Sequence, residues 1–575
     1  MQPKLWSRPL DPRHLTGLDH FPELLYSPTV RQGLQAHLPQ TNGLQMSRIS
    51  MATALTASRS PLSLASFRSP LAVSPSTGSR HEHRGLSHWM NRVLEELGSL
   101  HNSPDRDTVH DLRVAIRRCR SLAAVMEEVD PNPAWPEMRK VARKLFRGLG
   151  ALRDVQVMEE WIKKIAHQDD PLRAQLLTSL EADENEHSAN ALRVAAKFNE
   201  KEWTTLERRL RQRVRIVPVG GLAAECLALE RYEEAKELHN RALRTEKSKP
   251  WHALRIGIKR FRYTLGGLLP GHYAAWSENL KRLQDLLGDV HDLDVLSKHL
   301  EDTPPTGAES AKTWQEKIAQ ERRARIEVYR QLTLGKTSLW HEWRHNLPHG
   351  KRLEAAAMAR IRSTARAADA HSQRAGQVSR IALRLFELLR RVDAAPVFHE
   401  EAMRRLMLAA AQLHGISFAG GRSLSQKGIR KFLLGLSIPP NWTAEEWDLM
   451  AWAVRFHRGP EPKQKNGFAK LSEEQQTAVR ALAGVLRLAR ALRKSGVESS
   501  FGLRCEKSAD AILLSVPGLL DTVEIASRLA AAKHLLESVL EKPLILKSLP
   551  KPERPPAPMA HSSEPPQLAD PPVVA

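Results

Sequence analysis

The sequence predicts a mainly α-helical protein with two helical domains between disordered ends. Apolar residues recur at the helical period of about 3.6 residues through most of residues 84–548. Two blocks within that region recur in the same order, which indicates a duplicated helical unit at about 84–215 and 222–347. A change of sequence character near residue 370 marks a second, mostly helical domain over 370–548.

The N-terminal segment, residues 1–83, is expected to be disordered. Between Ser27 and Arg80 it has no acidic residue, is rich in Ser, Pro, Thr and Arg, and keeps no helical period. The stretch 51–80 is similar in composition to an organellar transit peptide, but its apolar residues line no clear face. We expect a plain tail, or a translation start downstream of Met1.

Six segments whose apolar residues recur at the helical period predict helices. They are 88–100, 111–128, 135–165, 222–244, 251–269 and 280–300. Strands are expected only near 511–516 and 543–547. The proline-rich segment 549–575 can propagate neither a helix nor a central strand, and we expect a disordered tail there.

The charge of the chain calls for an anionic partner. The 575 residues include 87 Lys+Arg against 65 Asp+Glu, a formal net charge of +22. Three separated cysteines exclude a disulfide scaffold and a zinc finger and favour the cytoplasm. No apolar run is long enough for a membrane span, and 5% aromatic residues argue against extended base-stacking surfaces.

The duplicated blocks carry basic residues at matched positions. VHDLRVAIRRCR at 109–120 aligns without gaps to WHALRIGIKRFR at 251–262, and RKLFRGLGALRDVQV at 143–157 aligns to KRLQDLLGDVHDLDV at 281–295. On a helix, His110, Arg113, Arg117 and Arg120 fall within an arc of about 80°. Residues 101–160 hold 11 Lys+Arg and 10 Asp+Glu, so the cations are sorted onto one face rather than in excess. Such a row of cations suits the binding of phosphate oxygens. A helix face that is simply exposed to solvent would show the same sequence pattern.

These doubled blocks resemble the CHAD domain, the conserved histidine α-helical domain, over about residues 84–347. The resemblance implies two four-helix-like halves around a pseudo-two-fold axis, with basic faces that line a channel for inorganic polyphosphate. It also implies a Gly-containing turn after each first block, at Gly150 and Gly288. Asp285 departs from the pattern, and we expect it to turn away or to pair with a neighbour. By position, the polyphosphate-binding candidates are His110, Arg113, Arg117, Arg118, Arg120, Arg139, Lys140, Arg143, Lys144, Arg147, His252, Arg255, Lys259, Arg260, Arg262, Tyr263, Lys281 and Arg282. The two histidines could donate to phosphate or be core residues bonded to a carbonyl.

The segment 370–548 resembles the helical HD-type C-terminal domain of the Ppx/GppA exopolyphosphatase family. The resemblance rests on short motifs in the expected order, among them LHG at 413–415, RFHR at 455–458 and LRLAR at 486–490. It implies His371, His414 and His457 as weak candidates for metal ligands. Gly415 and Arg490 stand where the pattern has carboxylates, and neither can bind a metal. We therefore expect no catalytic residue and no cofactor, with a divalent metal only if this domain is active.

The C-terminal domain is itself basic, with 27 Lys+Arg and 17 Asp+Glu between residues 371 and 548. Its cations could extend a polyanion track or form an ordinary solvated surface. They are Arg374, Arg422, Lys427, Arg430, Lys431, Arg455, Arg458, Arg487, Arg490 and Arg493.

Two functions follow from these resemblances. The first is binding of inorganic polyphosphate by a cytoplasmic protein, associated with polyphosphate granules, whose exopolyphosphatase-like domain is not catalytic. The alternative is a metal-dependent phosphohydrolase acting on polyphosphate or on nucleotides of the guanosine pentaphosphate type. Weak DNA binding through the same cations is a third reading, but no motif supplies sequence-specific base readout. The sequence does not indicate the oligomeric state.

Overall fold

The computed structural model describes residues 85–102, 105–302, 308–368, 372–416, 418–419, 422–462, 466–520 and 522–550. The expected disordered ends, 1–83 and most of 549–575, lie outside these residues. Within them the chain is mainly helical and forms two domains, as predicted. No described helix has both the length and the apolar character that a membrane crossing requires.

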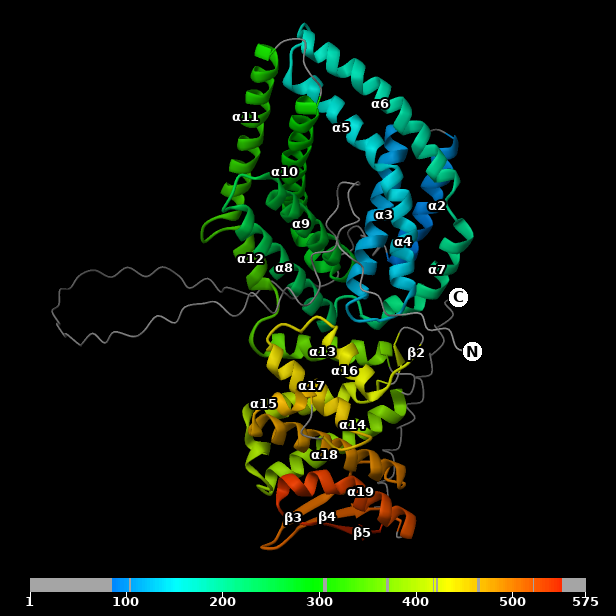
Figure 1. The fold of residues 1–575 in the computed structure, drawn as a ribbon, viewed down its shortest axis with the longest axis vertical. Helices are drawn as coiled ribbons and strands as arrows, with labels where there is room; N and C mark the ends of the chain where they lie inside the picture. Colours follow the sequence, from blue (N-terminus) through cyan, green and yellow to red (C-terminus); the bar gives the residue numbers. More distant parts are fainter. Residues whose placement is uncertain are drawn as a thin grey trace, which may run out of the picture. The chain divides into compact units, whose positions relative to one another are not determined.

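The helices of the first repeat are shown in blue to cyan and green in Figure 1. They are α2 (Leu86–Asn102), α3 (Arg106–Met126), α4 (Ala134–Gly148), α5 (Gly150–Ile165), α6 (Pro171–Ala196) and α7 (Glu200–Arg213). The single periodic segment expected at 135–165 is thus two helices, because the chain breaks at Leu149.

The second repeat follows in green (Figure 1). Its helices are α8 (Leu222–Ala242), α9 (Ser248–Leu268), α10 (Pro270–Asp302), α11 (Ala308–Thr333) and α12 (Leu339–Asn346). Helix α10 runs without interruption through Gly288, so the turn expected there is wrong for the second repeat. One longer helix replaces the α4–α5 pair of the first repeat.

The two repeats share their apolar cores. One core joins α2, α3 and α4 to α8, α9 and α12 and includes the fully buried rings of Trp135, Trp251 and Trp343. A smaller core joins α5 and α6 to α10 and α11 through residues such as Ile162 and Trp314. Since neither repeat buries its apolar faces alone, their basic faces are fixed relative to each other.

The remaining elements begin with α13 (Gly350–Ala368), which was not predicted. They continue with α14 (Ser372–Arg391), α15 (Glu401–Leu413), α16 (Gln426–Leu434), α17 (Ala444–Phe456), α18 (Glu473–Lys494) and α19 (Val523–Leu540). Short 3-10 turns lie at Val214–Ile216, Pro396–His399 and Asn466–Lys470.

Two small sheets complete the second domain. Strands β1 (Phe418–Ala419) and β2 (Arg422–Ser423) pair antiparallel. In the other sheet, β4 (Ile512–Pro517) pairs antiparallel with β3 (Arg504–Lys507) and parallel with β5 (Leu544–Leu549). The two predicted strands correspond to β4 and β5, with α19 as the crossover that a parallel pair requires. Strands β1, β2 and β3 were missed, because they are short or mostly exposed.

Candidate anion-binding site

Helix α3 has one apolar and one cationic face. Asp105 caps its first turn by accepting a hydrogen bond from the Thr108 amide at 2.7 Å. The buried positions include Leu112, Ile116 and Cys119. The opposite side carries His110, Arg113, Arg117 and Arg120, as the spacing predicts.

Helix α9 repeats this arrangement. Its buried positions include Trp251, Leu254 and Phe261. The cationic positions between them are only half-buried. Two helices at matched places in the repeats therefore each carry a basic row, defined here as His110, Arg113, Arg117 and Arg120 on α3 and His252, Arg255, Lys259 and Arg262 on α9.

The two basic rows lie close together. Burial lowers the pKa of Lys259 well below its usual value, and the charges of Arg255 and Arg117 lower it further. Arg117 likewise adds to the effect of burial in lowering the pKa of Arg255. The helices can approach because α9 has glycines there: a Cβ on Gly267 would lie 3.3 Å from Leu122 Cδ1 of α3. Cations of both repeats thus share one electrostatic environment.

Aromatic rings hold several of these guanidinium groups. Arg113 lies 4.5 Å from the centre of the Phe146 ring and donates to the Phe146 carbonyl at 3.3 Å. Arg120 lies 5.1 Å from the same ring. Arg118 lies over Trp89 at 4.5 Å and over Tyr263 at 5.5 Å. A ring orients a guanidinium without neutralising its charge, so these cations keep their attraction for an anion.

Tyr273 connects the cations of the two repeats. Burial by itself raises the pKa of its hydroxyl, but Arg262 and Arg118, which both hydrogen-bond to it, lower the pKa overall. Arg262 also donates to Gln284 Oε1 at 3.0 Å. Within the described part of the chain, neither guanidinium group forms an ion pair with a carboxylate.

Carboxylates do not neutralise the centre of the site. In the described part of the chain, Arg113, Arg117, Arg255 and Lys259 form no ion pair within 4 Å. The Nε atoms of Arg117 and Arg255 are buried and have no hydrogen-bond partner among these residues. Burial lowers the pKa of Arg113 to about 10, because removing the guanidinium from water disfavours its charged form.

Two aspartates at matched repeat positions face this cluster. Burial raises the pKa of Asp154, although Arg113 and Arg255 oppose the shift. Burial also raises the pKa of Asp292 to about 6, against the effects of Arg255 and Lys259. Because burial prevails over attraction at both residues, the aspartates compensate the cluster only in part.

The site histidines are held in the neutral form. Desolvation and the charges of Arg117 and Arg153 lower the pKa of His110. The Nδ1 atoms of His252 and His291 lie 3.0 Å apart, so one donates and the other accepts. Burial, followed by nearby cations, lowers their pKa values to about 4 and about 2. His252 is therefore bonded to a second histidine.

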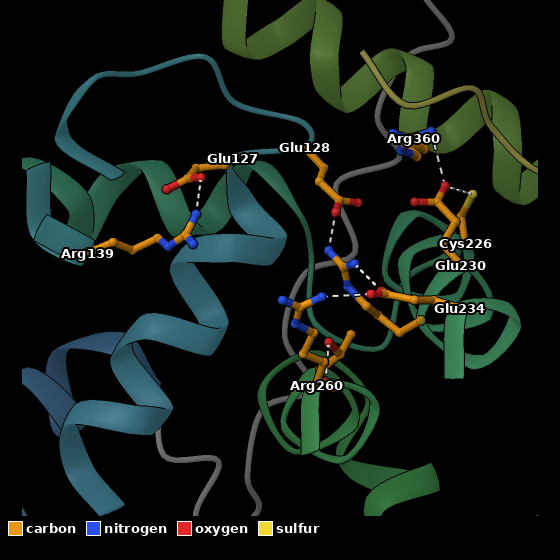
Figure 2. A network of polar contacts seen from close by, with 10 residues as sticks. Glu127, Glu128, Arg139, Cys226, Glu230, Glu234, Arg260 and Arg360 are labelled. Carbon is orange, nitrogen blue, oxygen red and sulfur yellow. Dashed lines mark hydrogen bonds and ion pairs between the residues drawn. The ribbon is translucent and has the colours of Figure 1, made fainter. Parts of the chain in front are cut away.

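Three of the predicted site residues form ion pairs with carboxylates. Arg139 contacts Glu127 at 2.6 Å and Arg260 contacts Glu234 at 2.7 Å, as Figure 2 shows. Lys281 contacts Asp285 at 3.2 Å, so Asp285 pairs with a neighbour as expected. The remaining candidates are Lys140, Lys144, Arg147 and Arg282, which are exposed, and Arg143, which is half-buried.

Sequence reasoning missed several residues of this site. Tyr273, Trp89 and Phe146 lie outside the cationic pattern, so nothing marked them as supports. His291 and Arg153 occupy the same aligned position in the two repeats, and that alignment could have identified them.

In the second domain, His414 and His457 lie together. Their ring centres are 5.6 Å apart, and each Nδ1 donates to the backbone carbonyl three residues earlier, at 2.8 Å for His414. Burial lowers the pKa of His414 to about 4, and that of His457 well below its usual value. The described part of the chain includes no group of three or more His, Cys, Asp or Glu that could hold a metal. His371 lies outside them.

Most cations of the second domain have protein partners. Arg430 pairs with Asp448 and lies 3.9 Å from the centre of the Trp452 ring, which Arg455 also contacts at 4.8 Å. Arg493 donates to Gln377 at 3.1 Å. Arg374, Lys427 and Lys431 are exposed, and the side chain of Arg422 is outside the described part of the structure.

Comparison with protein families assigns both domains. Residues 86–301 match the CHAD domain, and residues 358–536 match Ppx/GppA phosphatase, domain III. No protein with a curated description matches the chain. Among solved structures, it is similar to the crystal structure of the CHAD domain from the plant Ricinus communis. The two are 20% identical, the match covers 43% of this chain and 89% of that chain, and the TM-score is 0.33.

Proposed function

We propose that this chain, which contains a CHAD domain followed by a Ppx/GppA phosphatase domain III, binds inorganic polyphosphate through the two basic rows of α3 and α9. The observation that carries the proposal is the cluster of Arg113, Arg117, Arg255 and Lys259, which comes from both repeats. Among the described residues these cations have no carboxylate within ion-pairing distance.

A partly buried cation cluster whose own carboxylates compensate it only in part destabilises a protein unless an anion from outside supplies the missing negative charge. A phosphate chain suits this cluster because it carries a charge on every unit and offers paired oxygens to guanidinium groups. Helix α4, which packs on α3, carries the further exposed cations Lys140, Lys144 and Arg147. A long polyanion would neutralise more of these charges than a single phosphate would.

Polyphosphate is favoured over nucleic acid by what surrounds the cations. Phe146, Trp89 and Tyr263 are occupied by guanidinium groups, so they are not free to stack on bases. The backbone attraction that remains is independent of sequence. Association with polyphosphate granules in the cell would follow from this preference.

We also propose that domain III does not hydrolyse phosphate. Gly415 offers no ligand, and Arg490 adds positive charge beside His414 and His457. A divalent cation would therefore meet two histidines and an uncompensated guanidinium, and these residues do not fit a catalytic metal site.

Charge reversal tests the binding proposal. In Arg117→Glu/Lys259→Glu, two carboxylates are placed among cations, which should relieve repulsion and preserve the fold. We expect polyphosphate affinity to fall at least about 100-fold at physiological salt, since several contacts are lost together. The matched control is Lys201→Glu/Lys351→Glu, which changes net charge equally at two exposed sites and should keep nearly full affinity. Equal losses in both variants would reduce the binding to an effect of net charge.

A further inference from the structure

A cluster of cations lies in domain III, away from the basic rows of α3 and α9. Arg487 of α18 fixes the end of α17 by donating to the carbonyls of Phe456, Gly459 and Pro460 at 2.7, 2.9 and 3.0 Å. This contact holds Arg458, which lies within the fixed segment, beside α18. The next turn of α18 carries Arg490, and the turn after it carries Lys494.

These three cations lie close enough to repel one another. Burial lowers the pKa of Arg490, and the charge of Arg458 lowers it further. The pKa of exposed Lys494 is lowered by Arg490 first, then by desolvation, Arg528 and Arg458. In the part of the chain that the structure describes, Arg458, Arg490 and Lys494 form no ion pair.

Two acidic residues in the described part of this region are engaged elsewhere. Glu461 accepts from His534 at 2.9 Å and faces Arg487. Glu524 pairs with Arg528. The protein therefore leaves the cluster with three positive charges and no counterion of its own among the described residues.

The two buried histidines form the inner wall of this cluster. Arg490 and Arg458 both lower the pKa values of His414 and His457, after burial and the histidines' other contacts, so both guanidinium groups lie near both rings. Each Nδ1 is bonded to a backbone carbonyl, which fixes the ring orientation. Neutral rings exclude water on one side without adding a negative charge.

We propose that Arg458, Arg490 and Lys494 form a second binding site, for a phosphoryl oxyanion, beside His414 and His457. Arg490 stands where the Ppx/GppA-like sequence pattern has a metal-binding Asp. A positive side chain at that position favours an anion instead of a metal cation. The half-buried guanidinium of Arg490 can hold a pair of phosphate oxygens. Arg458, which also donates to the Gln426 side chain, adds positive charge, and exposed Lys494 marks the side open to solvent. The site is independent of the function proposed for the CHAD domain.

The test uses the full chain with the first site silenced by Arg117→Glu/Lys259→Glu. Inorganic tripolyphosphate and orthophosphate are titrated separately by calorimetry, which distinguishes the end of a chain from a free phosphate as the ligand. We expect one equivalent of at least one probe to bind. Adding Arg490→Ala/Lys494→Ala should weaken that binding at least about tenfold, because two charge-assisted contacts are lost.

The matched control is Arg391→Ala/Arg504→Ala, which removes the same charge from exposed positions of domain III and should leave the affinity unchanged. Arg490→Lys keeps the positive charge and should retain part of the binding. This retention would show that the loss in Arg490→Ala/Lys494→Ala comes from the missing charges and not from misfolding. Failure of the silenced chain to bind either probe, or an undiminished affinity after Arg490→Ala/Lys494→Ala, would overturn the proposal. The chain silenced by Arg117→Glu/Lys259→Glu is also tested for residual polyphosphate binding. If adding Arg490→Ala/Lys494→Ala removes that binding, the result supports this site even if the basic rows prove inactive.

Discussion

Asp292 offers a sharp prediction because its carboxylate opposes both folding and anion binding. Its pKa is raised from 3.8 to about 6, chiefly by burial, in spite of Arg255 and Lys259. At 1.36 kcal/mol per pKa unit, ionisation of Asp292 costs about 3 kcal/mol of folding free energy. Because the folded-state pKa lies above the unfolded-state value, this penalty is absent below about pH 4 and complete above about pH 6.

The variant Asp292→Asn should therefore be more stable than the wild type at pH 7, by up to about 3 kcal/mol, and equal to it near pH 4. Its polyphosphate affinity at pH 7 should rise about tenfold, since one like charge is removed from a site of effective dielectric about 20. Wild-type affinity should rise as the pH falls through about 6, and the variant should lack that rise.

Urea unfolding and calorimetric titration of both chains at several pH values measure these effects. The control is Asp289→Asn, one turn away on α10, whose carboxylate pairs with Arg325 at 3.3 Å. It should not increase the affinity. A destabilised Asp292→Asn chain with unchanged affinity would refute the reasoning, because the carboxylate would then be a net stabilising partner of Arg255 and Lys259.

Two further predictions concern the buried ion pair between Glu230 of α8 and Arg360 of α13, and the Phe146 ring beside the basic rows. In Arg360→Met, the buried Glu230 carboxylate loses the ion-pair partner that lies 3.0 Å away (Figure 2). The free energy of unfolding, measured by urea titration, should fall by about 3 kcal/mol. The double variant Glu230→Gln/Arg360→Met should recover most of that loss, because the unpaired charge is removed as well. Phe146→Leu keeps an apolar side chain but removes the ring beneath Arg113 and Arg120. Each cation–ring contact is worth about 0.5–1 kcal/mol, so polyphosphate affinity should fall several-fold. An unchanged affinity in calorimetry would show that the ring does not orient these cations.

The sequence was sufficient for the helical class, the duplication and the two basic rows, because these depend on local periodicity. The sorting of Arg113 and Arg117 away from Leu112 and Ile116 follows from helical geometry alone. It could not show that Arg260 pairs with Glu234 while Arg117 has no such partner among the described residues, since both are arginines in the same motif. That difference arises from tertiary packing of α8 on α9.

The same limit applies to the breaks in the helices. Gly150 follows a break at Leu149, whereas its aligned partner Gly288 lies inside a continuous helix. Glycine permits both conformations, and the surrounding packing decides between them. The aromatic supports were missed for a related reason, because Trp89 and Tyr273 reach Arg118 and Arg262 from other helices.

Competition for labelled polyphosphate tests the central claim most directly. The full chain is bound to labelled polyphosphate at physiological salt, and unlabelled polyphosphate, polyglutamate and duplex DNA are added at equal charge concentration. We predict that polyphosphate displaces the label at a concentration at least about tenfold lower than either competitor, because paired guanidinium contacts favour phosphate oxygens and no bases are read. Equal displacement by all three polymers would contradict the claim and leave only general attraction between a basic protein and an anion.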